Sequence, residues 1–139
     1  MNPSLQHLAA TILWSETDNS TPSGGEFLDE NYGIQDFDPE SLATLSQKFE
    51  AFVSKAETAI TEATGLADWT SIDEFYTGPS SSDYQTEHDY IMTVNGHGCG
   101  FWETHDWEPG VGTILTKLAE QETEIHAFAQ DGKVYLEFC

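Results

Sequence analysis

Residues 38–65, DPESLATLSQKFEAFVSKAETAITEATG, form the longest stretch of the chain with a clear helical pattern. Asp38 suits the N-cap, Pro39 suits the first helical position, and Glu40 faces the positive end of the helix dipole. Gly65 supplies a stop. Apolar residues recur at intervals of three and four, which predicts one long amphipathic helix. Its buried face is expected to consist of Leu42, Leu45, Phe49, Phe52, Val53, Ala56, Ile60 and Ala63.

Two shorter segments show the same kind of pattern. Residues 4–14 carry leucine and isoleucine at helical spacing and no acidic residue, so we expect a short amphipathic helix that packs on the long one. From Val111 onward, apolar residues again recur every three or four positions, which predicts a third helix of about three turns.

The last two apolar runs, residues 125–130 and 133–138, flank Asp131-Gly132. Asp-Gly between alternating apolar residues is the strongest short-range signal for a β-hairpin with a two-residue turn. This turn pairs Ala129 with Val134, Ala127 with Leu136 and Ile125 with Phe138. Because these six apolar side chains share one face, we expect that face to pack on the long helix.

A second alternating pattern occupies residues 88–103. Tyr90, Met92 and Val94 would share one face of a strand at 88–94, and the glycine-rich residues 95–98 would turn the chain back into 99–103. With 139 residues, the chain suits one domain. The predicted fold class is α+β: a single domain, residues 1–139, with N-terminal helices (one long) packed on a small antiparallel sheet built from two β-hairpins with a helix between them.

The chain is strongly acidic, with 25 Asp and Glu residues against four Lys and no Arg, and its net charge is −21. Eight Phe, four Trp and five Tyr residues nevertheless indicate a folded protein. A chain of this charge repels DNA and RNA, so we expect no direct nucleic-acid binding. No apolar run is long enough to span a membrane. Mutual repulsion is expected to raise the pKa values of many carboxyl groups.

The segment NGHGCGFWE, residues 95–103, resembles a motif found in a family of small acidic proteins encoded by tailed bacteriophages. The similarity extends, in the same order, to Leu13-Trp14 at the end of the first helix, Leu28-Asp29 in an acidic loop, the helix start Asp38-Pro39-Glu40, Leu115-Thr116 in a later helix, and the final turn at Asp131-Gly132-Lys133. The resemblance implies a phage origin and a place in the cytoplasm of the bacterial host. It implies no particular reaction.

The same segment contains the side chains best suited to chemistry. His97 and Cys99 would share one face of a strand, with His105 and Asp106 nearby, and could serve as metal ligands or as a nucleophilic pair. Zinc normally takes four ligands with closely spaced pairs, and only a His-x-Cys pair is present. We favour a glycine-rich structural turn and expect no metal, no cofactor and no catalytic residues, so the protein is predicted not to be an enzyme.

The remaining signal is the distribution of acidic residues. Residues 1–47 contain eight acidic residues and residues 56–116 contain eleven, and neither segment contains Lys or Arg. Duplex DNA carries about one negative charge per 1.7 Å of axis, a density that a small acidic protein can approach. We therefore hypothesise an inhibitor that mimics nucleic-acid charge and blocks a basic nucleic-acid-binding host protein, such as a CRISPR or restriction factor. Its predicted partner-binding residues, in expected loops and at element ends, are Asp18, Glu26, Asp29, Glu30, Asp36, Asp68, Asp73, Glu74, Asp83 and Glu87.

Two alternatives remain open at this point. Adaptation to a salt-rich solvent also favours acidic residues over lysine, and salt-dependent folding would reveal it. A phage accessory role would instead use a small metal or enzyme site at His97 and Cys99.

Overall fold

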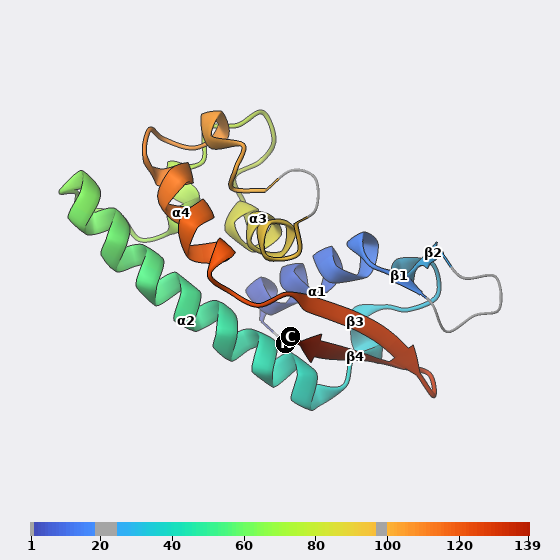
Figure 1. The fold of residues 1–139 in the computed structure, drawn as a ribbon. Coiled ribbons are helices and arrows are strands. Elements are labelled where there is room, and N and C mark those ends of the chain that lie inside the picture. The colour runs from blue at the N-terminus through green and yellow to red at the C-terminus, as the bar shows by residue number, and fades with distance from the viewer. Residues whose placement is uncertain (1, 19–24, 97–99) are drawn as a thin grey trace.

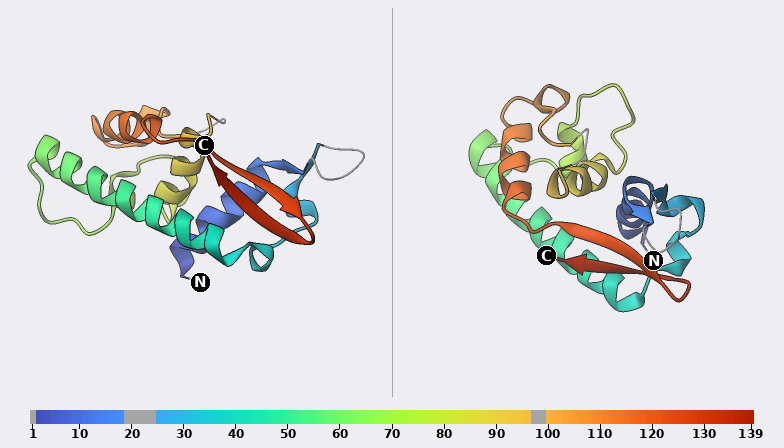
Figure 2. Two further views of the ribbon diagram at one scale, coloured as in Figure 1. Left: turned by 60° about the horizontal axis from the view of Figure 1, so that its bottom comes forward. Right: turned by 45° about the vertical axis from the view of Figure 1, so that its right-hand side comes forward.

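The long helix α2 runs along the molecule, and the other elements pack beside it, as the computed structural model shows (Figure 1, Figure 2). The structure describes residues 2–18, 25–96 and 100–139. Its helices and strands are α1 (Pro3–Ser15), β1 (Thr17–Asp18), β2 (Glu26–Phe27), α2 (Pro39–Thr64), α3 (Gln85–Val94), α4 (Val111–Glu120), β3 (Ile125–Gln130) and β4 (Lys133–Phe138). Short 3-10 helices occupy Leu28–Glu30, Ile34–Asp36, Ile72–Phe75 and Thr104–Asp106. The fold class is α+β, as predicted.

The start and end of α2 follow the local signals in the sequence. The side chain of Asp38 accepts a hydrogen bond from the backbone N–H of Ser41 at 3.0 Å and so caps the helix. Gly65 ends it with φ 71°, a left-handed conformation that glycine adopts without a steric penalty. With 26 residues, α2 is about 39 Å long. The predicted apolar face is confirmed for its central residues Leu45, Phe49, Phe52, Ala56 and Ile60, which are buried. Leu42 and Val53 are half-buried, and the prediction is wrong for Ala63, which is exposed near the end of the helix.

The terminal hairpin has the predicted register. Strands β3 and β4 pair Ile125 with Phe138, Ala127 with Leu136 and Ala129 with Val134. The hairpin packs across the N-terminal half of α2, where the backbone N–H of Leu136 donates to Ser41 Oγ at 3.0 Å and the N–H of Asp38 donates to the carbonyl of Val134 at 2.8 Å. Helix α1 contacts α2 as expected, and it also lies against α3.

The predicted hairpin at residues 88–103 is wrong. Residues 85–94 form helix α3, and within the segment 88–103 residues 97–99 lie outside the described part of the chain. A second two-stranded pairing does exist, between β1 and β2, but it lies in the segment expected to be a loop. The sequence does not predict helix α3 because eight of its ten residues are buried, and a helix that is buried over most of its surface lacks the wide, periodic polar face that identifies an amphipathic helix.

No local sequence pattern marks the start of α3 either. Its cap is Asp73, which accepts hydrogen bonds from the backbone N–H groups of Tyr84 at 2.9 Å and Thr86 at 2.8 Å. Asp73 also accepts a bond from the Thr86 hydroxyl at 2.6 Å. A residue more than ten positions away therefore satisfies the free N–H groups of the first turn.

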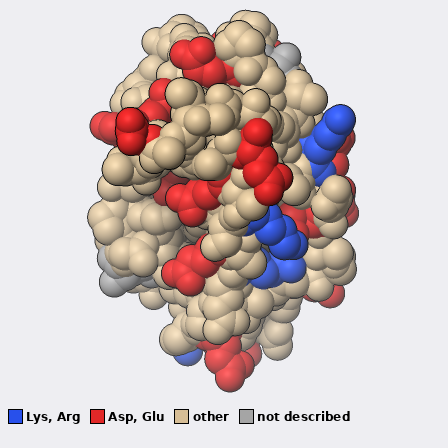
Figure 3. All heavy atoms as spheres, turned by 90° about the vertical axis from the view of Figure 1, so that its left-hand side faces the viewer, with Lys and Arg blue, Asp and Glu red and all other residues tan. Residues whose placement is uncertain are grey.

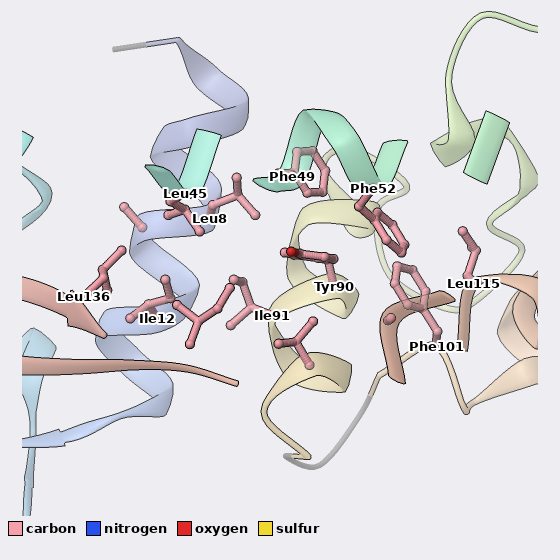
Figure 4. Packing of buried hydrophobic residues seen from close by; sticks show 14 of the residues in the cluster. Leu8, Ile12, Leu45, Phe49, Phe52, Tyr90, Ile91, Phe101, Leu115 and Leu136 are labelled. Atoms are coloured by element: carbon pink, nitrogen blue, oxygen red, sulfur yellow. The ribbon is translucent and has the colours of Figure 1, made fainter. Parts of the chain in front are cut away.

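Tyr90 of α3 lies at the centre of the core and is fully buried. Its ring lies 4.8 Å from that of Phe52 and 5.2 Å from that of Phe49, centroid to centroid, and Figure 4 shows it pointing from α3 toward α2. Phe101 also stacks on Phe52, with 5.8 Å between the ring centroids. The Tyr90 hydroxyl donates to Glu122 at 3.0 Å, so the one polar atom of the ring has a partner.

The end of α3 is tied to the hairpin by Asn95. Its side-chain amide donates to the carbonyl of Ile125 at 2.8 Å and accepts from the N–H of Ile125 at 2.7 Å, as a neighbouring strand would. The chain then passes close to α3 again, where the N–H of Phe101 donates to Thr93 Oγ1 at 2.8 Å. Gly100 is required at this approach because a Cβ there would collide with the Thr93 side chain.

Replacing Phe49 with alanine tests whether the α2–α3 aromatic cluster is the centre of the core. Phe49 is 6 % exposed and contacts both Phe52 and Tyr90, so Phe49→Ala should lower the free energy of unfolding by about 3 to 5 kcal/mol. Phe128→Ala is the matched control, because Phe128 is 43 % exposed and should cost less than about 1 kcal/mol. Urea unfolding curves that show equal losses for the two variants would contradict this assignment.

Candidate functional site

The ten acidic residues predicted to contact a partner differ widely in exposure. The exposed ones are Asp29, Glu30, Asp68, Glu74 and Asp83. The half-buried ones are Glu26, Asp36 and Asp73. The buried ones are Asp18 and Glu87.

The expectation that all ten are displayed is therefore wrong for Asp18 and Glu87. Asp18 is 1 % exposed because it lies in β1, between α1 and the paired strand β2. Glu87 is 7 % exposed because the first turn of α3 is covered by α1, whose Ser4 side chain hydrogen-bonds to it. Asp73 is committed to capping α3. These three carboxylates belong to the folded framework, and the other seven remain candidates for a contact surface.

The seven remaining residues lie in two stretches of the sequence, residues 26–36 before α2 and residues 68–83 after it. In the second stretch, Asp68 and Glu74 line a groove at the C-terminal end of α2. Asp83 instead precedes Tyr84, which stacks on His7 of α1. The sequence does not reveal this arrangement, because it depends on how the chain folds back along α2.

The four lysines occupy a different part of the structure. Lys48 and Lys55 lie on α2, Lys117 lies on α4 and Lys133 begins β4. The Lys48 ammonium sits 5.7 Å from the centre of the Phe138 ring, which places it where α2 meets the hairpin. Most of the positive side chains in Figure 3 gather on the right-hand side of that view, while acidic side chains spread over the rest. Helices α1 and α3 and both acidic segments contain no lysine.

A groove with a volume of about 660 Å³ lies at the C-terminal end of α2. We call it the α2-end groove. Phe75 and Val111 are buried beneath it, while Leu66 is 54 % exposed. The complete lining comprises Thr64, Gly65, Leu66, Ala67, Asp68, Trp69, Glu74, Phe75, Glu108, Pro109 and Val111.

Short-range contacts hold the walls of the α2-end groove in place. The indole N–H of Trp69 donates to the carbonyl of Leu66 at 3.2 Å, and its ring meets Phe75 edge to face at 5.0 Å. Across the groove, the N–H of Glu108 donates to the carbonyl of Phe75 at 2.8 Å. The groove therefore joins residues 64–75 and residues 108–111, which are far apart in the sequence, into one fixed surface.

Three carboxylates line the α2-end groove, and its lining contains no positively charged residue. Glu74 Oε2 accepts hydrogen bonds from the backbone N–H groups of Thr70 and Ser71, each at 2.7 Å, and from the Thr70 hydroxyl at 2.9 Å. These hydrogen bonds lower the pKa of Glu74, and the bond from the Thr70 N–H has the largest effect. The Glu74 carboxyl group is therefore ionised at neutral pH. Asp68 and Glu108 are exposed. The groove combines apolar walls with a site that favours a cation.

The sequence indicated Asp68 and Glu74 as binding residues but missed Glu108, which stands among many other acidic residues. Only the Pro109-Gly110 turn before α4 hints at the position of Glu108, since such a turn exposes its neighbours.

A second cavity, of about 240 Å³, lies between α2 and the start of α3 and contains Asp73 and Glu87. Burial raises the pKa of Glu87, and the nearby Asp73 carboxylate adds to the increase, while the hydrogen bond from Ser4 opposes it. Beside it, Tyr84 adopts φ 60° and stacks on His7 at 4.1 Å. Repulsion between carboxylates, which was expected to raise many pKa values, is thus only a secondary cause of the raised pKa of Glu87. At Glu74 the pKa is lowered instead, because hydrogen bonds stabilise its charged form.

The predicted alternative site at His97 and Cys99 lies outside the described residues. His105, which was grouped with them, is exposed, with its Nδ1 3.8 Å from Glu103 and its Nε2 3.4 Å from Asp106. Within residues 2–18, 25–96 and 100–139, no group of three or more His, Cys, Asp or Glu side chains is arranged to hold a metal ion.

Comparisons with models of protein families, with curated protein sequences and with solved structures gave no match. In the part of the chain that the structure describes, no helix has both the length and the apolar character needed to cross a membrane.

Replacing Glu87 with glutamine tests the effect of its burial on stability. Because the folded pKa of Glu87 is raised, folding favours its protonated form, so its contribution to stability falls as pH rises from the unfolded pKa through the folded pKa. Glu87→Gln should therefore stabilise the protein at pH 7.5, by on the order of 1 kcal/mol, and by less at pH 4.5. The control is Glu62→Gln, an exposed change on α2 with the same loss of charge. Thermal unfolding at the two pH values is the measurement, and an equal effect for both variants would contradict the prediction.

Proposed function

We propose that this protein acts by binding, as an acidic inhibitor that mimics the charge of nucleic acid and occupies the basic surface of a nucleic-acid-binding host protein. The observation that supports this most directly is the set of exposed acidic residues on the segments before and after α2, which contain no lysine. Its resemblance to tailed-phage proteins adds a reason for the target to be a bacterial defence factor in the host cytoplasm, such as a CRISPR or restriction protein.

The length of the molecule is compatible with such mimicry. One turn of B-form DNA extends about 34 to 36 Å, and helix α2 alone is about 39 Å long. A protein surface built to follow phosphates over one turn carries basic residues over a comparable distance. Acidic residues distributed along the molecule could therefore meet such a surface.

The charge distribution also favours one orientation of binding. All four lysines lie on α2, α4 and β4, so the most negative potential is expected over the lysine-free segments. A basic partner would be steered toward those segments. Nucleic acid would be repelled by the net charge of −21, so the protein would compete with nucleic acid without binding it.

The first experiment identifies the partner and tests competition. The protein is used to capture host proteins from an infected-cell lysate, and each captured protein is purified. Its binding to labelled duplex DNA or RNA is then measured by fluorescence anisotropy with increasing amounts of this protein. We expect displacement of the nucleic acid, with an affinity that falls steeply between 0.1 and 0.5 M salt because screening over about 10 Å or less weakens the attraction. Simultaneous binding of nucleic acid and this protein would contradict the proposal.

A matched pair of variants tests whether the position of the charges matters. The triple variant Asp29→Asn, Glu30→Gln and Asp83→Asn removes three exposed charges from the lysine-free segments. The control Glu120→Gln, Asp131→Asn and Glu137→Gln removes three exposed charges from or beside the lysine-bearing elements. At about 0.2 to 1 kcal/mol per exposed pair, the first variant should bind the partner roughly threefold to a hundredfold more weakly, and the control should bind almost as well as the parent. Equal effects would indicate that net charge alone governs binding.

Thermal unfolding in 0.1 M and 2 M KCl distinguishes charge mimicry from adaptation to a salt-rich solvent. A charge mimic that works in an ordinary bacterial cytoplasm should be folded at 0.1 M salt. A chain that folds only in molar salt would instead indicate that its acidic surface is suited to the solvent.

A further inference from the structure

We propose that the α2-end groove binds an arginine side chain of the partner and so anchors the complex. This inference rests on the proposed function, because it assumes that the partner is basic, and it assigns one specific contact within that interface. The groove is hollow and partly apolar as well as acidic. Those properties together point to a particular side chain rather than to a general attraction between charges.

The apolar part of the groove suits the stem of a long side chain. Leu66 is 54 % exposed, and Trp69 and Phe75 form an aromatic wall. The methylene groups of arginine can cover such apolar surface while the charged head stays near water. The indole of Trp69 is the best aromatic partner for a cation, and its hydrogen bond to Leu66 fixes the ring before any ligand arrives. Little ordering is then required on binding.

The polar part of the groove suits a guanidinium group. Asp68, Glu74 and Glu108 supply three carboxylates, and the lining offers no lysine to neutralise them. The C-terminal end of α2 adds negative dipole potential, while the N-terminal end of α4 adds positive potential, so the two helix ends offset each other. The electrostatic potential in the groove is therefore negative, because the full charges of the three carboxylates determine it.

Arginine fits this arrangement better than lysine. The three hydrogen bonds that hold the Glu74 carboxylate all end on Oε2, so they leave Oε1 to accept from a ligand. A planar guanidinium can bridge two carboxylates with its several N–H groups and stack on an aromatic ring at the same time. A lysine ammonium is a compact, strongly hydrated charge and gains less from an aromatic wall.

The volume of the groove, about 660 Å³, falls within the range of small-molecule sites. It is larger than one guanidinium requires, so it also has room for part of a neighbouring residue of the partner. The exposed Leu66 would contact that residue if it is apolar. The predicted anchor is thus an arginine beside an apolar residue in an otherwise basic segment.

The test uses small probes, so it does not depend on identifying the partner. Nα-acetyl-arginine amide is titrated into the ¹⁵N-labelled protein while the indole N–H signals of the tryptophans are followed by NMR. Nα-acetyl-citrulline amide, which has the same shape without the charge, and Nα-acetyl-lysine amide are the comparison probes. We expect the arginine probe to shift the Trp69 signal in a saturable way, with a dissociation constant on the order of 1 mM for a single side chain. Citrulline should produce no saturable shift, and lysine should bind at least threefold more weakly.

Variants locate the probe within the groove. Asp68→Asn with Glu108→Gln removes two exposed groove charges and should weaken arginine binding at least fivefold. Glu120→Gln with Glu137→Gln removes two exposed charges elsewhere and should change it less than twofold. Unchanged melting temperatures confirm that both variants fold. Equal binding of arginine and citrulline, or equal weakening by the two variants, would overturn the inference.

The outcome for the groove can be separated from the outcome for the proposed function. The arginine titration needs neither the partner nor nucleic acid, and its variants differ from the Asp29, Glu30 and Asp83 set. If the probe binds the groove but the partner binds together with nucleic acid, charge mimicry fails and the arginine site stands. If the partner competes with nucleic acid but the probe does not saturate, the arginine site fails and charge mimicry stands.

Discussion

The structure depends on burying most of helix α3. Eight of its ten residues are buried, and two of them, Glu87 and Asp89, are acidic. A charged group can remain inside only if it is hydrogen-bonded, and Asp89 accepts from Trp107 Nε1 at 3.1 Å and Gln85 Nε2 at 2.8 Å. The elements α1, α2, α4 and the Trp107 segment are therefore held together by one central helix, with Tyr90 as its largest fully buried side chain.

The sequence predicts the elements whose signals are local and fails where the signals are distant. Helix α2 has its cap, periodic face and stop within its own residues, and the terminal hairpin has its turn at Asp131-Gly132, so both were predicted in detail. Helix α3 is capped by Asp73 from another segment and has no polar stripe, and its alternating apolar residues suggest a strand. The packing around residues 88–94 decides whether they form a helix or a strand. A local sequence pattern does not describe that packing.

The sequence could indicate which acidic residues belong to the candidate site, but not how these residues are arranged in space. The sequence identified the lysine-free acidic segments, and the structure confirms that most of the ten selected carboxylates are at least partly exposed. It could not show that Glu87 is covered by α1, because that contact joins residues more than eighty positions apart. For the same reason the sequence could not predict the α2-end groove. Trp69 and Glu108 line it together, and the backbone hydrogen bond between Glu108 and Phe75 connects their two segments.

The acidic residues therefore divide by their role in the fold, and this division limits what charge alone can explain. Asp38, Asp73 and Asp89 each accept hydrogen bonds that hold a helix or a buried ring in place, so their charge is compensated locally. Asp29 and Asp83 are exposed in segments that contain no cation, and they add to the negative potential. Glu74 does both, since one of its oxygens closes the loop before Phe75 and the carboxylate lines the groove. Binding at the α2-end groove would thus use a negative charge that folding has already fixed in position, and this fixed geometry is what distinguishes a recognition site from a merely acidic surface.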